Sequence, residues 1–368
     1  MNVAETTASV RSGRPGKVLA VVLLLLGLIA VAELSVRLFY SADGVGRTLR
    51  RVGGPNSRVR EHPIWRFELV PDERGVASVN AMGFRGPEIA ASLPAKVRRI
   101  IFVGGSTTYG VQLGDDETYP RQLAQILASS HPGEYDVINA GVPATDLTYH
   151  LRKARPLYRP LAPAVVGLNT GWNELSTHIL GCSTRALHLQ PESRLARLLF
   201  RSHIVRYAIT WARQAKLERG VRKLASSPSL REDLAPVVAR AGERIRAFAE
   251  EFVGTGTNFV LVPQPSILSG RSLEAIAANE GLPRGFRDRW AALPQRQALL
   301  VVYQEEFTRM LLALAAERAD MFIADCTSAC AEGSDEDRRA RFIDAIHLSG
   351  VGNALLAECL ARHILELR

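Results

Sequence analysis

One long apolar segment lies close to the N-terminus of the chain. Residues 18–32 include no charged or strongly polar side chain, and after Glu33 the apolar character continues to residue 39. About 20 mostly apolar residues in a helix are enough to cross a bilayer core. A core helix would show a polar face, which this segment lacks. We therefore predict a transmembrane anchor over residues 18–40.

A cleaved signal peptide is the alternative for this segment. A short basic tail, residues 1–17, precedes it with Arg11, Arg14 and Lys17, and residues 30–32 (AVA) resemble a small-residue cleavage site. Because the apolar helical pattern continues past that site, an uncleaved anchor is favoured. Cations flank the segment on both sides, so the positive-inside rule leaves its orientation open.

From residue 99 onward, short apolar runs alternate with amphipathic stretches. Strands buried on both faces are continuous apolar runs, and their alternation with helices is typical of a parallel, doubly wound α/β sheet. About five strands are predicted, at residues 99–103, 136–139, 164–169, 258–262 and 321–324. Helices are predicted at residues 118–128, 147–158 and 350–367, with Ser349 as the cap of the last one.

Two more helices follow from apolar side chains at three- and four-residue steps. One apolar stripe runs from Leu234 to Phe252, and the other follows Pro294 as far as Leu314. A stripe of this kind marks the side of a helix that packs on a core. Both are expected to face the sheet.

The same pattern divides the chain into four parts. The basic tail covers residues 1–17 and the anchor residues 18–40. Residues 41–98, rich in Gly, Pro and Arg, are predicted to be a linker and an irregular N-terminal extension whose ordered part is 77–85. Residues 99–368 form the α/β domain, with a helical elaboration at about 185–257.

Charge is concentrated around the apolar segment. Residues 1–60 carry nine Lys or Arg against three Asp or Glu, which is +6 of the net +9. The remaining 308 residues are nearly neutral, which argues against a nucleic-acid-binding surface. The basic residues after the anchor are expected to contact anionic lipid head groups.

Candidate functional residues follow the first three predicted strands, at the sheet edge where ligands of such sheets bind. Ser106 comes after Gly104-Gly105 at a helix start, where N–H groups and the helix dipole favour negative charge. Gly141 follows the second strand and Asn173 the third. A backbone N–H and a side-chain amide in these places could stabilise an oxyanion. Taken singly, each residue also fits an ordinary turn or helix cap.

Asp344 and His347 directly precede the closing helix. A serine hydroxyl is a weak nucleophile until a base takes its proton. His347 is the candidate base for Ser106, and Asp344 is placed to orient its imidazole. A surface histidine beside a capping aspartate is the alternative. The other seven histidines are expected in loops or on helical surfaces.

Together these sequences resemble the four signature blocks of the SGNH (GDSL) hydrolase superfamily. The chain is more closely similar to a bacterial membrane-anchored branch that has GGST in place of GDS. The resemblance covers about residues 77–368. Its motifs are GGST at 104–107, NAG at 139–141, GWNE at 171–174 and DAIH at 344–347, with GFRG at 83–86 and ETYP at 117–120.

The resemblance implies a flavodoxin-like three-layer α/β/α fold and a serine-esterase mechanism. In that mechanism Ser106 is the nucleophile, His347 the base and Asp344 its orienting acid. The oxyanion hole would consist of the backbone N–H groups of Ser106 and Gly141 and the side chain of Asn173. No metal and no organic cofactor is needed.

The implied function is removal of an acyl group, such as acetyl, from an ester on an envelope or extracellular glycan. The expected partners are this acyl-ester substrate and the membrane. Two alternatives stay open: an O-acyltransferase that uses the same triad, and a non-catalytic membrane-tethered scaffold. Glu174, where the third block normally has Asp, could loosen the hold on Asn173. Together with the helical stretch at 175–257 it favours the scaffold, whereas the intact Ser, Asn, Asp and His set opposes it.

The four cysteines are Cys182, Cys326, Cys330 and Cys359. None has the spacing of a zinc site. Cys326 and Cys330 could form a disulfide in an oxidising compartment, or they could remain buried free thiols. The disulfide hypothesis and the resemblance both favour a catalytic domain on the extracytoplasmic side, periplasmic or extracellular.

Overall fold

The computed structural model describes residues 14–39, 59–71, 77–90, 92–180, 195, 199, 202–288 and 291–367. Most of the predicted tail, residues 41–58 of the predicted linker and Cys182 lie outside these residues. The chain forms two compact units. The first is Met1–Gly44 with Gln190–Thr210, and the second is Val45–Leu189 with Trp211–Arg368.

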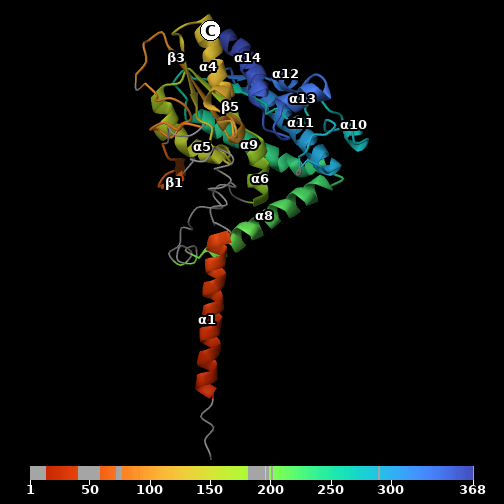
Figure 1. The fold of residues 1–368 in the computed structure, drawn as a ribbon. Coiled ribbons are helices and arrows are strands. Elements are labelled where there is room, and N and C mark those ends of the chain that lie inside the picture. The colour runs from red at the N-terminus through yellow and green to blue at the C-terminus, as the bar shows by residue number, and fades with distance from the viewer. Residues whose placement is uncertain are drawn as a thin grey trace, which may run out of the picture. The chain divides into compact units, whose positions relative to one another are not determined.

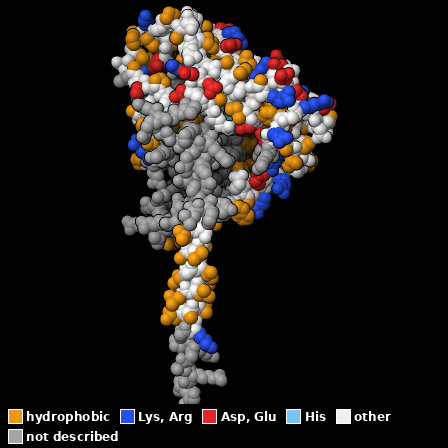
Figure 2. Space-filling model, in the orientation of Figure 1, with side chains coloured by type: hydrophobic (Ala, Val, Ile, Leu, Met, Phe, Trp, Pro, Cys, Tyr) orange, Lys and Arg blue, Asp and Glu red, His pale blue; other side chains and the backbone are white. Residues whose placement is uncertain are grey.

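The predicted anchor is a helix, α1 (Arg14–Phe39), of 26 residues. At 1.5 Å per residue it is about 39 Å long, more than the roughly 30 Å of a hydrocarbon core. Its large apolar side chains are exposed, and Figure 2 shows hydrophobic side chains along its described length. Residues Lys17–Ser35 are a candidate membrane span by length and composition, a test that a signal sequence also passes.

A parallel five-stranded sheet forms the centre of the second unit (Figure 1). The strand order is β4-β3-β5-β6-β7, so the order reverses beside β3. All five predicted strands are confirmed to within two residues. They are β3 (Arg98–Gly104), β4 (Tyr135–Asn139), β5 (Val165–Asn169), β6 (Asn258–Leu261) and β7 (Met321–Ile323).

Helices cover both faces of this sheet because the side chains of each buried strand point alternately to either face. On one face, Ile101 and Val103 of β3 pack with α5 (Leu147–Lys153) and α9 (Leu230–Glu250). On the other, Ile100 and Phe102 pack with α4 (Tyr119–Ser130) and α14 (Gly350–Glu366). Helix α11 (Pro294–Glu317) contributes to both clusters. The predicted three-layer α/β/α arrangement is confirmed.

Shorter elements connect these layers. The helix predicted at 147–158 is regular only to Lys153, because Pro156 has no N–H to donate and a π-helical turn takes over. Ser349 caps α14 as predicted, accepting a hydrogen bond from the N–H of Gly352. The remaining helices are α3 (Ser106–Tyr109), η1 (Asp115–Glu117), η2 (Ala154–Tyr158), η3 (Arg159–Leu161), α6 (Trp172–Leu180), α8 (His203–Ala225), α10 (Leu273–Ala277), α12 (Thr327–Ala331) and α13 (Asp335–Arg341).

The extension before the sheet contains a hairpin, where irregular structure was expected. Strands β1 (Val59–His62) and β2 (Arg66–Leu69) pair antiparallel. Trp65, Phe67 and Leu69 pack in a small cluster that includes Tyr109 and Tyr149. Each strand has only four residues and carries charged side chains, so the sequence shows no apolar run. Burial against residues distant in sequence stabilises the hairpin.

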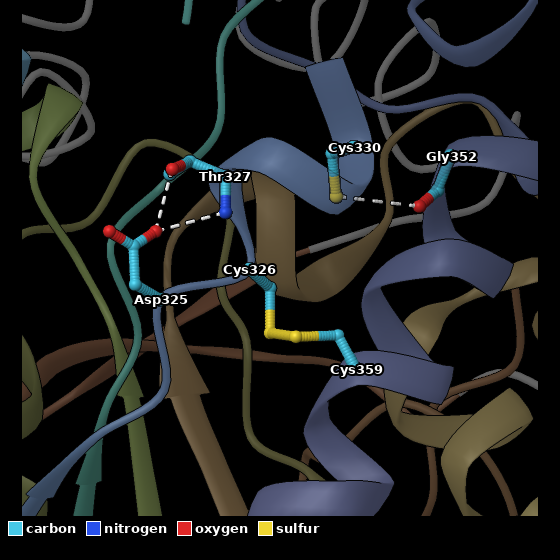
Figure 3. The surroundings of a disulfide bond; sticks show 6 residues. All are labelled: Asp325, Cys326, Thr327, Cys330, Gly352 and Cys359. Atoms are coloured by element: carbon cyan, nitrogen blue, oxygen red, sulfur yellow. Dashed lines mark hydrogen bonds between the residues drawn. A yellow bond between two sulfur atoms is a disulfide. The ribbon is translucent and has the colours of Figure 1, made fainter. Parts of the chain in front are cut away.

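The hypothesis of a disulfide between Cys326 and Cys330 is wrong. Cys326 is bonded to Cys359, with their Cα atoms 5.9 Å apart. Figure 3 shows Cys326 meeting Cys359 of α14, whereas Cys330 lies one turn along α12 and points toward the carbonyl oxygen of Gly352. Cys330 is a buried free thiol, and burial raises its pKa to about 12.

We expect Cys359→Ala to lower the free energy of unfolding by about 3–4 kcal/mol, because the bond closes a loop of 33 residues. Thermal melts of the full chain with and without reductant measure this. Cys330→Ala is the matched control, which keeps the bond and its response to reductant. Peptide mapping under non-reducing conditions should recover Cys326 joined to Cys359. Recovery of Cys330 in a disulfide would contradict the assignment.

Candidate active site

Ser106 stands at the carboxyl end of β3, on a turn that only glycines permit. A Cβ on Gly104 would lie 2.1 Å from Oγ1 of Thr108, and one on Gly105 would lie 2.2 Å from Nδ2 of Asn173. Real side chains do not tolerate such approaches. The two glycines therefore let β3 pass directly into α3, with Ser106 as the first helical residue and half-buried.

Ser106, His347 and Asp344 are joined by hydrogen bonds. Nε2 of His347 lies 2.8 Å from Oγ of Ser106, and Nδ1 lies 2.7 Å from Oδ2 of Asp344. The backbone N–H groups of Ile346 and His347 donate to Oδ1 of the same carboxylate. Burial alone would raise the pKa of Asp344, but the bonds from His347 and these N–H groups outweigh it and lower that pKa. Asp344 is thus ionised at neutral pH and can stabilise an imidazolium.

The loop that carries His347 is fixed in its middle and at its C-terminal end. Oδ2 of Asp288 accepts a hydrogen bond from the N–H of Ala345 at 2.8 Å, and the Ala345 carbonyl accepts one from Ile267. On the C-terminal side the loop passes into the capped start of α14. Sequence reasoning missed Asp288 because it lies 57 residues before its partner and in no motif.

The two other predicted site residues flank the Ser106 turn. Nδ2 of Asn173 lies against Gly105 and donates to the carbonyl of Thr145 at 2.7 Å. Gly141 packs on α3, where a Cβ would lie 2.3 Å from the backbone nitrogen of Tyr109. Its N–H already donates to Oδ1 of Asn139, at 3.0 Å. Gly141 therefore fits the site by shape, but its N–H is engaged.

Glu174 is held firmly by hydrogen bonds, although its longer side chain was expected to loosen the hold on Asn173. The carboxylate is buried, accepting hydrogen bonds from the N–H of Leu147 at 2.7 Å and from Thr170. Nη1 of Arg244 donates to its second oxygen at 2.6 Å. Burial, and then the nearby Asp146, raise the pKa of Glu174, while the bonds from Leu147 and Arg244 oppose this. The longer side chain thus ties α6 to the start of α5.

Gln264, just after β6, links the ends of three strands. Its Nε2 donates to Oγ1 of Thr107 at 2.7 Å and to Oδ1 of Asn169 at 2.9 Å. Its Oε1 accepts the N–H of Trp172, at the start of α6. A glutamine in a Pro-flanked loop gives no sequence signal of this role. The network keeps the residues around Ser106 and Asn173 in one arrangement.

Comparison of the sequence with models of known families and with curated proteins gives no match. Among solved structures, the chain is similar to a GDSL-like lipase from Bacteroides thetaiotaomicron, with 13% identity, 76% of this chain and 93% of that chain covered, and a TM-score of 0.41. It is also similar to a catalytic mutant of an acetylxylan esterase from Geobacillus stearothermophilus, with 12% identity, 74% and 96% coverage, and a TM-score of 0.42.

At these identities and TM-scores the likeness says nothing about chemistry, which has to come from the side chains. One group of side chains has the spacing of a metal site. Among the described residues, Cys326, Cys359 and His363 bring possible ligand atoms within 4.8 Å of one another. Both sulfurs belong to the disulfide, so neither can serve as a thiolate ligand.

Arg85, in the GFRG segment, holds the far end of α3. Its guanidinium donates to the carbonyls of Tyr109, Gly110 and Leu113, and lies 4.8 Å from the centre of the Tyr109 ring. Nε pairs with Asp115 at 2.9 Å. The side chain is buried and gives these carbonyls a charged donor, while the Gly110 carbonyl also accepts the N–H of Leu113.

We expect Arg85→Met to lower the free energy of unfolding by about 3 kcal/mol, because it leaves buried carbonyls and Asp115 without their cation. Denaturant titration of the full chain in a mild detergent measures this. Arg246→Met, which breaks an exposed pair with Glu317, should cost less than about 1 kcal/mol. Equal losses in the two variants would contradict this role of Arg85.

His150 and Lys153 form a buried polar pair behind Ser106. His150 was expected on a helical surface, which is wrong. Its Nε2 lies 3.0 Å from the carbonyl of Gly104 and its Nδ1 2.8 Å from the Tyr158 hydroxyl, and burial lowers its pKa to about 3. Lys153 is 1% exposed. Its Nζ lies 5.2–5.7 Å from the centres of four aromatic rings, those of Trp65, Phe84, Tyr149 and Tyr158.

Burial lowers the pKa of Lys153 from 10.5 to about 7, against a smaller opposing effect of Glu68. Between these pH values the unfolded chain binds a proton that the folded chain does not, so this lysine makes stability rise with pH. Below about pH 7 both states are protonated and its full penalty applies. We therefore expect wild type to gain stability relative to Lys153→Met from pH 7 to pH 10.

Paired thermal melts of wild type and Lys153→Met across this range measure the difference directly. Methionine keeps most of the side-chain volume and has no charge to bury, so the variant should be the more stable protein at pH 7. A difference in melting temperature that stays constant with pH would show that Lys153 does not titrate in this window.

Proposed function

We propose that this chain is a membrane-anchored serine hydrolase of SGNH type that acts on carboxylic esters. The observation that carries the proposal is the unbroken line of hydrogen bonds from Ser106 through His347 to Asp344, at 2.8 and 2.7 Å. A serine, a base in reach of its hydroxyl and an acid that orients the base are the three requirements of this chemistry.

Each residue then has one task. Nε2 of His347 takes the proton of Ser106 while Oγ attacks the ester carbonyl carbon. When the tetrahedral intermediate collapses, the bond to the alcohol oxygen breaks, and His347 gives the proton to the leaving alcohol. Water, deprotonated by the same imidazole, then attacks the acyl-enzyme. The bond between the acyl carbon and Oγ of Ser106 breaks, Oγ takes the proton back from His347, and the acid is released. Asp344 stabilises the imidazolium in both steps and keeps Nε2 pointed at Ser106.

The oxyanion would be stabilised by donors on both sides of the Ser106 turn. The first N–H groups of a helix have no partner within the helix, and Ser106 is the first residue of α3, so its N–H is one of these groups. Nδ2 of Asn173 carries two hydrogens, of which one is used on Thr145. The N–H of Gly141 can join them only by sharing its hydrogen with Asn139. One such donor typically contributes 10²–10³-fold to kcat.

The disulfide supports an extracytoplasmic location for the proposed hydrolase. Bonds of this kind persist in oxidising compartments, and Cys326–Cys359 joins two buried elements of the hydrolase unit. We therefore place this unit on the extracytoplasmic side, with α1 as its anchor. An acylated envelope or extracellular glycan is the class of substrate that such a location supplies.

The proposal predicts that a fluorophosphonate probe labels the detergent-solubilised full chain, because such probes react with activated serines. Ser106→Ala and His347→Ala should both abolish labelling. Ser130→Ala and His131→Ala, at the end of α4, are matched controls that should label like wild type. Labelling is read by in-gel fluorescence and located by mass spectrometry.

Three outcomes would count against the proposal. A folded wild type that takes no label would mean that Ser106 is not activated and would favour the scaffold. Labelling that survives Ser106→Ala would mean that another serine reacts. Labelling that survives His347→Ala would remove the assigned base.

A further inference from the structure

A large apolar pocket in the second unit lies beside the candidate active site. Its volume is about 540 Å³, and Asn173 and His347 are among the residues that line it. Small-molecule sites commonly measure about 300–1,000 Å³. The apolar part of the wall consists of Trp172, Leu175 and Ile179 of α6, Leu217 and Val221 of α8, Leu300 of α11, and Ala345 and Ile346 of the His347 loop.

Most polar groups of the wall are engaged in holding the site, and Arg287, which also lines the pocket, is exposed. Asp288 accepts hydrogen bonds from the N–H groups of Ala345 and Ala291, and Ser176 donates to the carbonyl of Asn173. The carboxylate of Asp344 faces His347. What remains for a ligand is mainly hydrocarbon surface, which favours an apolar group.

Of the two halves of an ester, the acyl group suits this pocket better than the alcohol. A glycan alcohol is polar and would gain nothing from leucine and isoleucine side chains. The acyl group also stays attached to Ser106 through both steps, whereas the alcohol leaves after the first. Apolar contacts to the acyl group can therefore stabilise both transition states.

We infer that the preferred acyl group is a hydrocarbon chain of several carbons, and that the α6 and α8 side chains of the pocket bind it. This inference rests on the proposed function, and it replaces acetyl as the expected group. An acetyl methyl would leave most of the 540 Å³ unfilled. The inference also assigns a role to the C-terminal half of α8, which the sequence predicted only as a helical elaboration.

The test compares p-nitrophenyl acetate, butanoate and hexanoate as substrates of the full chain in lipid nanodiscs, which avoid detergent tails in the pocket. Each buried methylene is worth about fourfold in binding. We expect kcat/KM for hexanoate to exceed that for acetate at least tenfold. Equal values, or a preference for acetate, would overturn the inference.

Two variants should narrow the pocket, Leu217→Trp and Ile179→Trp. Each is expected to lower the hexanoate-to-acetate ratio of kcat/KM at least tenfold. Leu312→Trp, on the exposed side of α11, is the matched control and should leave that ratio unchanged. Two filling variants are used so that one misfolded protein does not decide the result. An unchanged ratio in both folded variants would show that the acyl chain of the substrate binds elsewhere.

A second series holds the acyl group constant as acetate and lengthens the alcohol from ethyl to hexyl. A tenfold gain in this series would assign the pocket to the alcohol and overturn the acyl assignment. Fluorophosphonate labelling of Ser106 reports on the proposed function separately. If labelling fails, binding of hexanoate to Ser106→Ala still tests the pocket by calorimetry: saturable binding that Leu217→Trp weakens supports it, and no binding refutes it.

Discussion

The close approach of strand ends β3 and β5 is the constraint on which the rest of the site depends. Gly104 and Asn169 are paired across these strands, and no side chain fits on Gly104 or Gly105. Any Cβ there would push Thr108 or Asn173 away and open the turn. Because the turn stays tight, Ser106 begins a helix at the point where the strand order reverses, where open α/β sheets bind their ligands.

Around this turn, buried polar side chains substitute for the water that packing excludes. Arg85 satisfies the carbonyls after α3, Glu174 is paired with Arg244, and Gln264 connects Thr107 with Asn169. A buried polar group costs free energy unless it has a hydrogen-bond partner. Each of these bonds therefore both stabilises the fold and restricts the turn to one geometry. The neutral His150, bonded to the Gly104 carbonyl, extends the same support behind the strand.

The His347 loop and the pocket depend on elements from the C-terminal half of the chain. The disulfide joins Cys326, after β7, to α14, the helix that directly follows the His347 loop. Asp288 holds the middle of that loop. Residues of α6, α8 and α11 form the apolar wall beside it. The proposed reaction thus needs polar groups at the strand ends and hydrocarbon surface from the surrounding helices.

The sequence by itself determined the five strands of the central sheet, the long helices packed on it and the identity of the candidate triad. Strands and long helices follow from local apolar periodicity, and Ser106, Asp344 and His347 follow from motif and order. Tertiary structure decided what local periodicity does not encode. The partner of Cys326 lies 33 residues away, and Lys153 is buried only because aromatic rings from the hairpin, the GFRG segment and α5–η2 enclose it. The pocket likewise exists only where α6, α8 and α11 meet, because burial and cavity shape depend on contacts between residues far apart in the chain.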